Sequence, residues 1–258
     1  MSEDLDRRFS GLNRLWGSGA TQRLAQSHVV VVGVGGVGSW AVEALARSGV
    51  GRLTLIDFDQ IAESNINRQI HALSETLGMA KVDALKTRIR SIHPGCEVDV
   101  IEDFVTPENI DQIMPSGLDA LIDACDQFHA KQAMASWAIQ HAKNFITVGA
   151  AGGKLHAQMV RVNDLSAVTH DPLLGRLRRE LRKALGIAQA SSMGVTCVYS
   201  QEPIRSDQSC GIEQTQSSRD LSCHGYGSFV GVTATFGLVA AGCAIEQLLV
   251  QKPALNTL

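Results

Sequence analysis

Five polar side chains in the first half of the chain have the types and spacing that triphosphate chemistry requires. Asn65, Arg68 and Lys81 follow the second apolar segment, and Asp123 and Asp126 close a later one. An arginine can bind two phosphate oxygens at once, whereas a lysine acts as a point charge. Magnesium is held by a few carboxylates together with phosphate oxygens. These side chains together predict attack on a magnesium-bound nucleoside triphosphate. A dehydrogenase has no evident need for such a set of side chains.

A glycine-rich stretch before these side chains predicts where the phosphates bind. The four valines at 29–32 predict a strand buried on both faces, and residues 39–48 predict a helix. Glycines between them let the backbone approach a ligand, and the N–H groups at a helix start attract phosphate. A second strand at 52–56 ends where an acidic residue can hydrogen-bond a ribose hydroxyl. The residues concerned are Gly33, Gly35, Gly36, Gly38, Asp57 and, close behind, Asp59.

The elements that must position these side chains alternate between strand and helix. We expect strands near 28–32, 52–56, 97–101, 119–123 and 145–148, and helices near 39–48, 79–91, 107–114 and 129–142. This alternation predicts an α/β fold: a Rossmann-like, mostly parallel sheet with helices on both faces. Further strands are expected at 157–162, antiparallel, and at 195–200, with a helix over 228–249.

We expect a single domain over residues 1–258. Residues 1–27 would form a helical lead-in and residues 28–150 the nucleotide-binding core. Residues 151–258 would form a substrate-side extension that ends in a helix.

Composition and cysteine spacing narrow the class of protein. The 258 residues are 45% hydrophobic with a net charge of −3, so RNA binding would need a local basic patch. Six cysteines include no Cys-x-x-Cys pair, and we expect no zinc. No apolar run follows the charged N-terminus, which favours a cytoplasmic protein. The uncharged segment 229–245 is shorter than the roughly 20 residues of a membrane span, so we expect no membrane contact.

The ordered motifs resemble the adenylation core of the ThiF/MoeB/HesA superfamily, relatives of ubiquitin-activating enzymes. They are residues 33–38, 57–59, 65–69, 81 and 123–126. Further phrases at 8–17, 36–41, 67–73, 103–109, 171–173 and 232–237 are most similar to the tRNA threonylcarbamoyladenosine dehydratase branch. The resemblance covers nearly the whole chain. It implies ATP-dependent dehydration, a cyclisation, of N6-threonylcarbamoyladenosine beside the tRNA anticodon, through an acyl adenylate.

The resemblance also implies roles for individual residues. The glycine-rich loop would carry ATP, Asn65, Arg68 and Lys81 would bind its triphosphate, and Asp126 would hold Mg²⁺. Arg14 matches an arginine that reaches the triphosphate from the other subunit, which implies a homodimer. An ion pair within its own helix is the alternative for Arg14.

A basic amphipathic helix over residues 171–185 is the candidate contact with tRNA. Asp171 can cap this helix, and Pro172 suits its first turn. Its cations could contact tRNA phosphates, which would give affinity without sequence specificity. The alternative is the solvated side of a surface helix, but five cations against the single Glu180 in an acidic protein favour tRNA. The cations are Arg176, Arg178, Arg179, Arg182 and Lys183.

Cys223 lies in a segment, 205–224, that predicts a long loop on the substrate side. Its thiolate could accept the acyl group from the adenylate. Dehydration does not require that step, because the adenylate can be attacked within the same substrate.

Two other functions stay open: activation of a sulfur-carrier or ubiquitin-like protein C-terminus, and a dinucleotide-dependent oxidoreductase or nucleotide sensor. Docking of a sulfur-transfer partner protein is also open.

Overall fold

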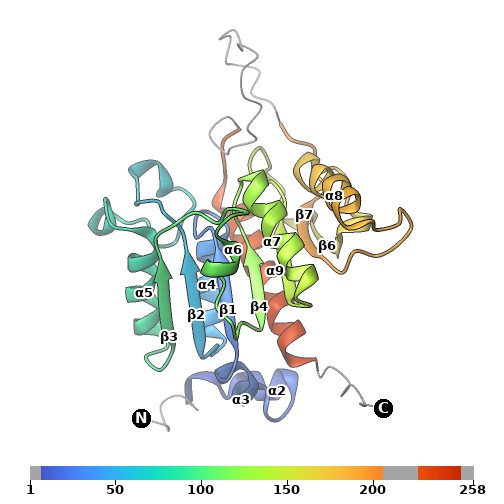
Figure 1. Cartoon of the computed structure of the whole chain (residues 1–258). Coiled ribbons are helices and arrows are strands. Elements are labelled where there is room, and N and C mark those ends of the chain that lie inside the picture. The colour runs from blue at the N-terminus through green and yellow to red at the C-terminus, as the bar shows by residue number, and fades with distance from the viewer. Residues whose placement is uncertain (1–6, 206–225, 251–258) are drawn as a thin grey trace, which may run out of the picture.

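One seven-stranded sheet organises the chain in the computed structural model, which describes residues 7–205 and 226–250. The strand order is β3-β2-β1-β4-β5-β7-β6, and every neighbouring pair is parallel except β6 with β7 (Figure 1). This confirms the predicted mostly parallel sheet and its antiparallel extension. The strands are β1 (His28–Val32), β2 (Arg52–Ile56), β3 (Glu97–Ile101), β4 (Ala120–Asp123), β5 (Asn144–Val148), β6 (Val160–Asp164) and β7 (Thr196–Ser200).

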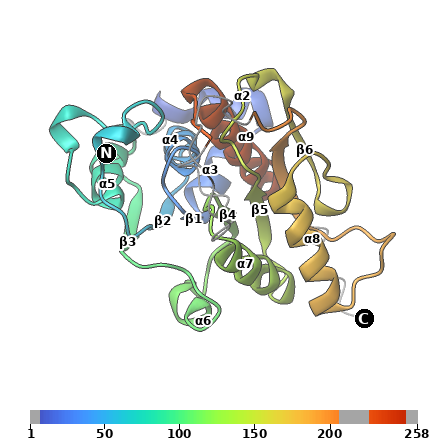
Figure 2. The same cartoon turned by 90° about the horizontal axis from the view of Figure 1, so that it is seen from above.

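Helices cover both faces of the sheet (Figure 2). Strand β1 shows why: Val29 and Val31 pack into one apolar layer, and Val30 and Val32 pack into the other. A strand with two apolar faces belongs in the middle of a parallel sheet. The first layer contains α4 (Gly38–Arg47), α5 (Lys81–Ile92) and α9 (Val230–Leu249), and the second contains α6 (Ile110–Ile113), α7 (Phe128–Gln140) and α8 (Pro172–Leu185).

The two ends of the sheet carry different elements (Figure 1). Helices α2 (Gly11–Trp16) and α3 (Ala20–Ala25) lie at the amino ends of the strands, where the Gly51 N–H donates to the Leu24 carbonyl. The loops after β1, β2 and β4 meet at the carboxyl ends. Ligands of such sheets bind outside the carboxyl ends, so the predicted nucleotide residues lie at the appropriate edge.

Helix α9 is a core helix. It is the one helix in the described part of the chain that is long and apolar enough to cross a membrane by length and composition. It packs against α4, β4 and β5, and Phe236, Ala240 and Ala244 are fully buried. These contacts within the fold account for its apolar sequence.

Two predicted segments differ from the structure. Strand β6 begins at Val160 because residues 157–159 form a 3₁₀ turn, and α6 is a single turn. The Asn109 side chain accepts from the Thr106 N–H and donates to the Phe104 carbonyl, which holds residues 104–109 as a loop. Cys223 and almost all of the predicted loop 205–224 lie outside the described residues.

Candidate nucleotide-binding site

The glycine-rich loop between β1 and α4 packs against the turn that follows β4. Gly33 has a φ of 79°, and a Cβ there would lie 2.8 Å from the backbone nitrogen of Cys125. A Cβ on Gly38 would overlap the carbonyl oxygen of Gly33. Only glycine fits such close approaches. These two glycines therefore let the loop and the β4 turn form one compact edge.

The other two glycines lie beside side chains. A Cβ on Gly36 would lie 3.2 Å from the Arg68 side chain, and one on Gly35 would lie 3.7 Å from Gln69 Nε2. Within residues 7–205 and 226–250, no acceptor binds the N–H groups of Gly35, Gly36 and Val37. These groups precede a ten-residue helix, α4. Free N–H groups at a helix start can bind phosphate oxygens.

Asp57 links the loop to β2 and to Lys81. Its Oδ2 accepts from the Val34 N–H at 2.8 Å, and its Oδ1 accepts from the Asp59 N–H at 2.9 Å. Lys81 Nζ lies 2.5 Å from Asp59 Oδ2 and 3.8 Å from Asp57 Oδ1. Burial raises the pKa of Asp57, although Lys81 and the two N–H groups oppose the shift. The lysine thus lies in a nearly buried position where phosphate could replace carboxylate as its partner.

The segment that carries Asn65 and Arg68 lies against the same loop. Asn65 is buried, and its Oδ1 accepts from the Ala62 N–H at 3.0 Å, which fixes the short turn before Arg68. The Trp40 indole N–H, from α4, donates to the Arg68 carbonyl at 2.9 Å. Gln69 is buried, and its Oε1 has no partner within the described residues. Gln69 therefore adds a polar group to the predicted set.

The structure places Asp123 inside the protein, whereas the sequence interpretation had it facing a magnesium ion. Its carboxylate is fully buried and lies 2.6 Å from Lys131 Nζ. Thr147 Oγ1 donates to it at 2.6 Å, and the Cys125 thiol donates at 2.9 Å. Burial alone would lower the pKa of Lys131, but the pair with Asp123 raises it. Asp123 and Lys131 are therefore an internal ion pair.

Lys131 is the residue that the sequence interpretation missed. Its ammonium also donates to the Val148 carbonyl at 3.1 Å, so it joins the carboxyl ends of β4 and β5. The signal in the sequence was a lone cation within the otherwise uncharged segment 128–140.

Asp126 is exposed on the turn after β4, at the edge that carries Gly33. Within the described residues no donor binds its carboxylate, and no cluster of three or more His, Cys, Asp or Glu side chains could hold a metal. Magnesium at nucleotide sites often uses one or two carboxylates plus phosphate oxygens. Asp126 fits that arrangement only with a nucleotide present.

Comparison with known proteins identifies the family. The ThiF family model matches residues 9–257. The chain belongs to the ThiF family. The chain is 41% identical over 257 residues to the tRNA threonylcarbamoyladenosine dehydratase of Escherichia coli, with 96% of each chain covered. The Haemophilus influenzae protein of that name is 39% identical, with 97% of this chain and 96% of that one covered.

Solved structures agree with this assignment. A crystal structure of the E. coli dehydratase in complex with ATP matches with a TM-score of 0.84 and 40% identity over 94% of each chain. A second structure, named TcdA (CsdL), gives a TM-score of 0.85 at 42% identity. The described fold is thus the adenylation fold of the ThiF family. The bound ATP was observed in the E. coli protein.

In this ThiF-family chain, Arg14 does not lie with the other predicted site residues. It lies on α2, at the amino ends of the strands, whereas Asp57 and Asp126 follow carboxyl ends (Figure 1). Arg14 is exposed, and no acceptor among the described residues binds its guanidinium. Within one chain it therefore does not complete the site.

The cations of α8 are less free than the sequence interpretation assumed. Arg178 donates to the carbonyls of Leu165 and Val168, at 3.3 and 2.7 Å, and Arg182 donates to the Gln189 carbonyl at 2.6 Å. These two arginines hold the segments that flank the helix.

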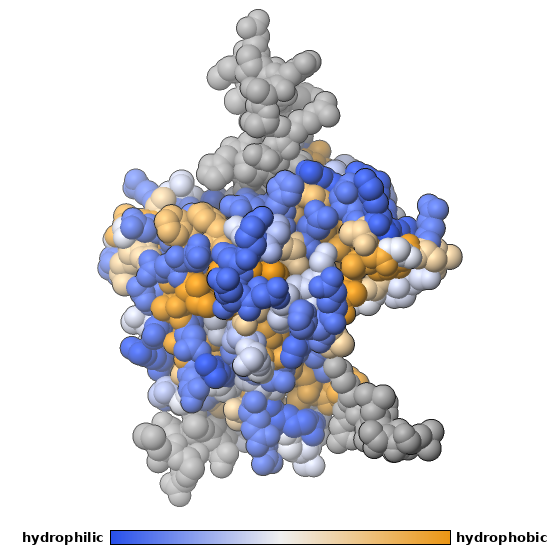
Figure 3. Space-filling view, viewed as in Figure 1, coloured by the Kyte–Doolittle hydropathy of each residue, from blue (hydrophilic) through white to orange (hydrophobic). Residues whose placement is uncertain are grey.

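The other three α8 cations remain exposed. Arg176 stacks 3.7 Å from the centre of the Phe128 ring, whereas Arg179 and Lys183 have no partner within the described residues. Hydrophilic residues gather over α8 on the face shown in Figure 3. The predicted cap is present, because the Asp171 carboxylate accepts from the Leu174 N–H.

Proposed function

We propose that this ThiF-family chain is an ATP-dependent tRNA threonylcarbamoyladenosine dehydratase. The observation that carries the proposal is the edge at which Arg68 and Lys81 lie beside a glycine-rich loop with free N–H groups. Relatives of nearly the same length with that activity in their names support the choice of substrate.

The first step is adenylation of the threonyl carboxylate. A carboxylate oxygen attacks the α-phosphorus of ATP, and the bond to pyrophosphate breaks. Arg68, Lys81 and Asn65 bind the triphosphate and stabilise the charge that develops on the leaving pyrophosphate. Lys81 exchanges Asp59 for phosphate in this step, while Asp57 accepts from a ribose hydroxyl. Asp126 would hold Mg²⁺, which neutralises phosphate charge when bound.

The second step is ring closure. The carbamoyl group of the same substrate attacks the activated carbonyl, AMP leaves and a proton is released. The sum of both steps removes one water from the nucleoside. Because nucleophile and electrophile belong to one molecule held in one site, proximity supplies much of the acceleration. The thiol of Cys223 is not needed for this route.

A homodimer completes the site in this proposal. Arg14 lies at the far end of its own sheet, so it can act on ATP only from the partner subunit. The exposed cations of α8, Arg176, Arg179 and Lys183, would contact tRNA phosphates. A cytoplasmic location is part of the same proposal, and it is supported by the tRNA substrate that the relatives' names give.

Mass spectrometry of the modified nucleoside tests the proposal. The protein is incubated with ATP, magnesium and tRNA that carries threonylcarbamoyladenosine, and the tRNA is then digested. We expect a nucleoside lighter by one water, formed with one AMP, and no product with Lys81→Ala. AMP formation driven by the C-terminus of a sulfur-carrier protein, with no change in the tRNA, would instead identify a protein activator.

A further inference from the structure

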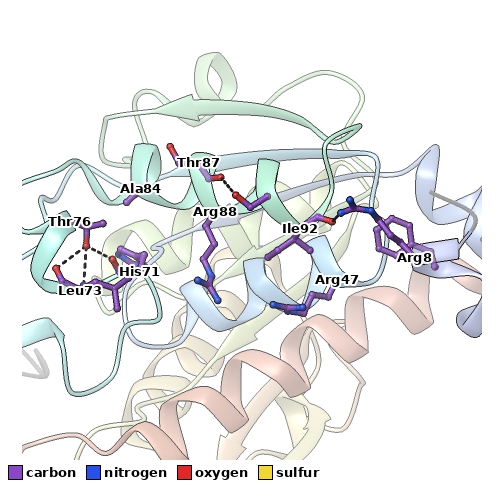
Figure 4. A pocket seen from close by; sticks show the side chains of 11 residues that line it. Arg8, Arg47, His71, Leu73, Thr76, Ala84, Thr87, Arg88 and Ile92 are labelled. Atoms are coloured by element: carbon purple, nitrogen blue, oxygen red, sulfur yellow. Dashed lines mark hydrogen bonds between the residues drawn. The ribbon is translucent and has the colours of Figure 1, made fainter. Parts of the chain in front are cut away.

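A cavity lies on the first helix layer, outside the nucleotide site. It has a volume of about 620 Å³ and runs along α5, with α4 on one side and residues 71–76 at one end. Its lining includes Phe9, Arg47, His71, Leu73, Arg88 and Ile92. His71 and Thr76 lie at one end and Arg8 at the other, with Arg88 and Arg47 between them (Figure 4). We call this cavity the α4–α5 groove. The proposed adenylation makes no use of it.

The groove contains two arginines that share one carboxylate. Glu43 Oε1 lies 2.7 Å from Arg47 Nε and 3.1 Å from Arg88 Nη2, and Glu43 Oε2 lies 2.6 Å from Arg88 Nε. Burial alone would raise the pKa of Glu43, but hydrogen bonds from Arg88 and Arg47 lower it, so the carboxylate is ionised. Two guanidinium groups against one carboxylate leave one net positive charge. Each arginine also keeps N–H donors that Glu43 does not use.

His71 lies at one end of the groove and is an unusual polar residue in its wall. Its side chain lines the groove and is 2% exposed, yet neither ring nitrogen has a partner within the described residues. Burial, together with Lys81 and Arg88, lowers the pKa of His71 to about 4, so the ring is neutral near pH 7. A neutral imidazole has one donor and one acceptor, and leaving both unused when buried is costly. The ring carbons of His71 therefore contribute to the groove wall, while its two nitrogens are enclosed and unpaired within the described residues.

Apolar side chains form much of the remaining wall. Phe9 is buried against the groove, and Leu73, Ala84 and Ile92 also line it. The volume lies within the range of sites for small organic ligands. An inorganic ion would leave these walls uncovered, whereas a ligand with an apolar body would bury them.

We propose that the α4–α5 groove binds a small organic anion, whose phosphate or carboxylate group contacts Arg47 and Arg88 and whose apolar body lies toward Phe9, Leu73 and Ile92. The site is distinct from the nucleotide site, and the proposal does not depend on the proposed reaction.

Isothermal titration with phenyl phosphate tests the groove. The full-length protein is first saturated with a non-hydrolysable ATP analogue, so that the nucleotide site is filled. We expect phenyl phosphate to bind and benzyl alcohol, which lacks the anionic group, not to bind. Titration with benzoate then shows whether the arginines prefer a carboxylate or a phosphate. Arg47→Gln should weaken binding about tenfold, since it removes a charge-assisted hydrogen bond. Arg90→Gln, an exposed arginine on the same helix as Arg88, should change it less than about twofold.

A second variant reverses the sign. Glu43→Gln removes the carboxylate that Arg47 and Arg88 share, which leaves both positive charges available to the ligand. Phenyl phosphate should therefore bind about three- to tenfold more tightly. Thermal melting confirms that each variant is folded, and Arg88→Gln repeats the test should Arg47→Gln fail to fold.

Several results would overturn the proposal. One is the absence of phenyl phosphate binding, which includes the case of a groove covered by a second copy of the chain. Equal effects of Arg47→Gln and Arg90→Gln would show a non-specific charge effect. Binding that occurs only without the ATP analogue would assign the anion to the nucleotide site.

Discussion

Two aspartates three residues apart illustrate how much the environment decides at the scale of the residue. Asp123 is fully buried and is neutralised by Lys131, whereas Asp126 is exposed at the edge of the glycine-rich loop. A buried carboxylate with its own ammonium has little left to offer a metal. Asp126 is therefore the carboxylate to which a role in magnesium binding can be assigned by mutation.

Asp126→Asn should lower adenylation at least about 100-fold, because it removes the negative charge that faces magnesium and phosphate. ATP–pyrophosphate exchange measures the loss, and an unchanged melting temperature shows that the fold is intact. Asp83→Asn, an exposed aspartate on α5, is the matched control. Normal exchange with an ordinary magnesium dependence would remove Asp126 from the site.

His71 should make the protein lose stability in mild acid. Its pKa is about 4 in the folded protein, against 6.5 for the free side chain, because the ring is buried. As the pH falls below about 6.5, the unfolded state takes up the proton first, so the folded state loses up to about 3 kcal/mol by pH 4. Urea unfolding between pH 7 and 4 measures this slope. His71→Leu should flatten it, and an equally steep slope in that variant would assign the effect to other groups.

At the scale of the element, α7 is tied to the sheet through one buried ion pair. Lys131→Met leaves the Asp123 carboxylate buried without its cation, and such breaks cost about 3–5 kcal/mol. Urea unfolding should show this loss. Adding Asp123→Asn to Lys131→Met should recover part of it, because the uncompensated charge is gone. A double variant as unstable as the sum of the two singles would contradict this coupling.

Helix α8 contains exposed cations and cations bound to backbone carbonyls. Replacing the first kind should affect tRNA binding, and replacing the second should affect stability. Arg179→Gln with Lys183→Gln should reduce the slope of log affinity for tRNA against log salt by about 1.5 to 2, if both contact phosphates. Anisotropy of labelled tRNA over a salt series measures it, and stability should stay unchanged. Arg178→Gln should instead cost about 1–3 kcal/mol of stability, because it frees the Leu165 and Val168 carbonyls. An unchanged salt slope in the double variant would make α8 a solvated face.

The sequence predicted the elements well where one pattern dominated. Valines 29–32 predicted a strand buried on both faces, and Asp171-Pro172 marked the start of α8. Side-chain partners were not predictable in the same way. The pairing of Asp123 with Lys131, and of Arg178 with carbonyls at 165 and 168, depends on the register of packed helices. Residue types alone could not distinguish these internal partners from ligand contacts.

At the scale of the whole molecule, the separation of α2 from the carboxyl ends predicts shared active sites. Arg14→Ala and Lys81→Ala subunits should each be inactive alone. After random subunit exchange, half of the dimers are hybrids, and one of the two sites in each hybrid keeps both cations. About a quarter of wild-type adenylation should therefore return. Mass-resolved hybrids without any recovered activity would show that Arg14 does not act across the interface.

The position of α9 has a consequence for how the protein is made. This helix covers β4 and β5, yet about 100 residues separate the end of β5 from the end of α9. At roughly 5–20 residues per second of synthesis, that part of the sheet stays bare for about 5–20 s on the ribosome. We therefore expect the nascent chain to bind chaperones during this interval. Translation that stops before residue 230 would leave this apolar surface uncovered, and we expect the truncated product to be degraded by proteases.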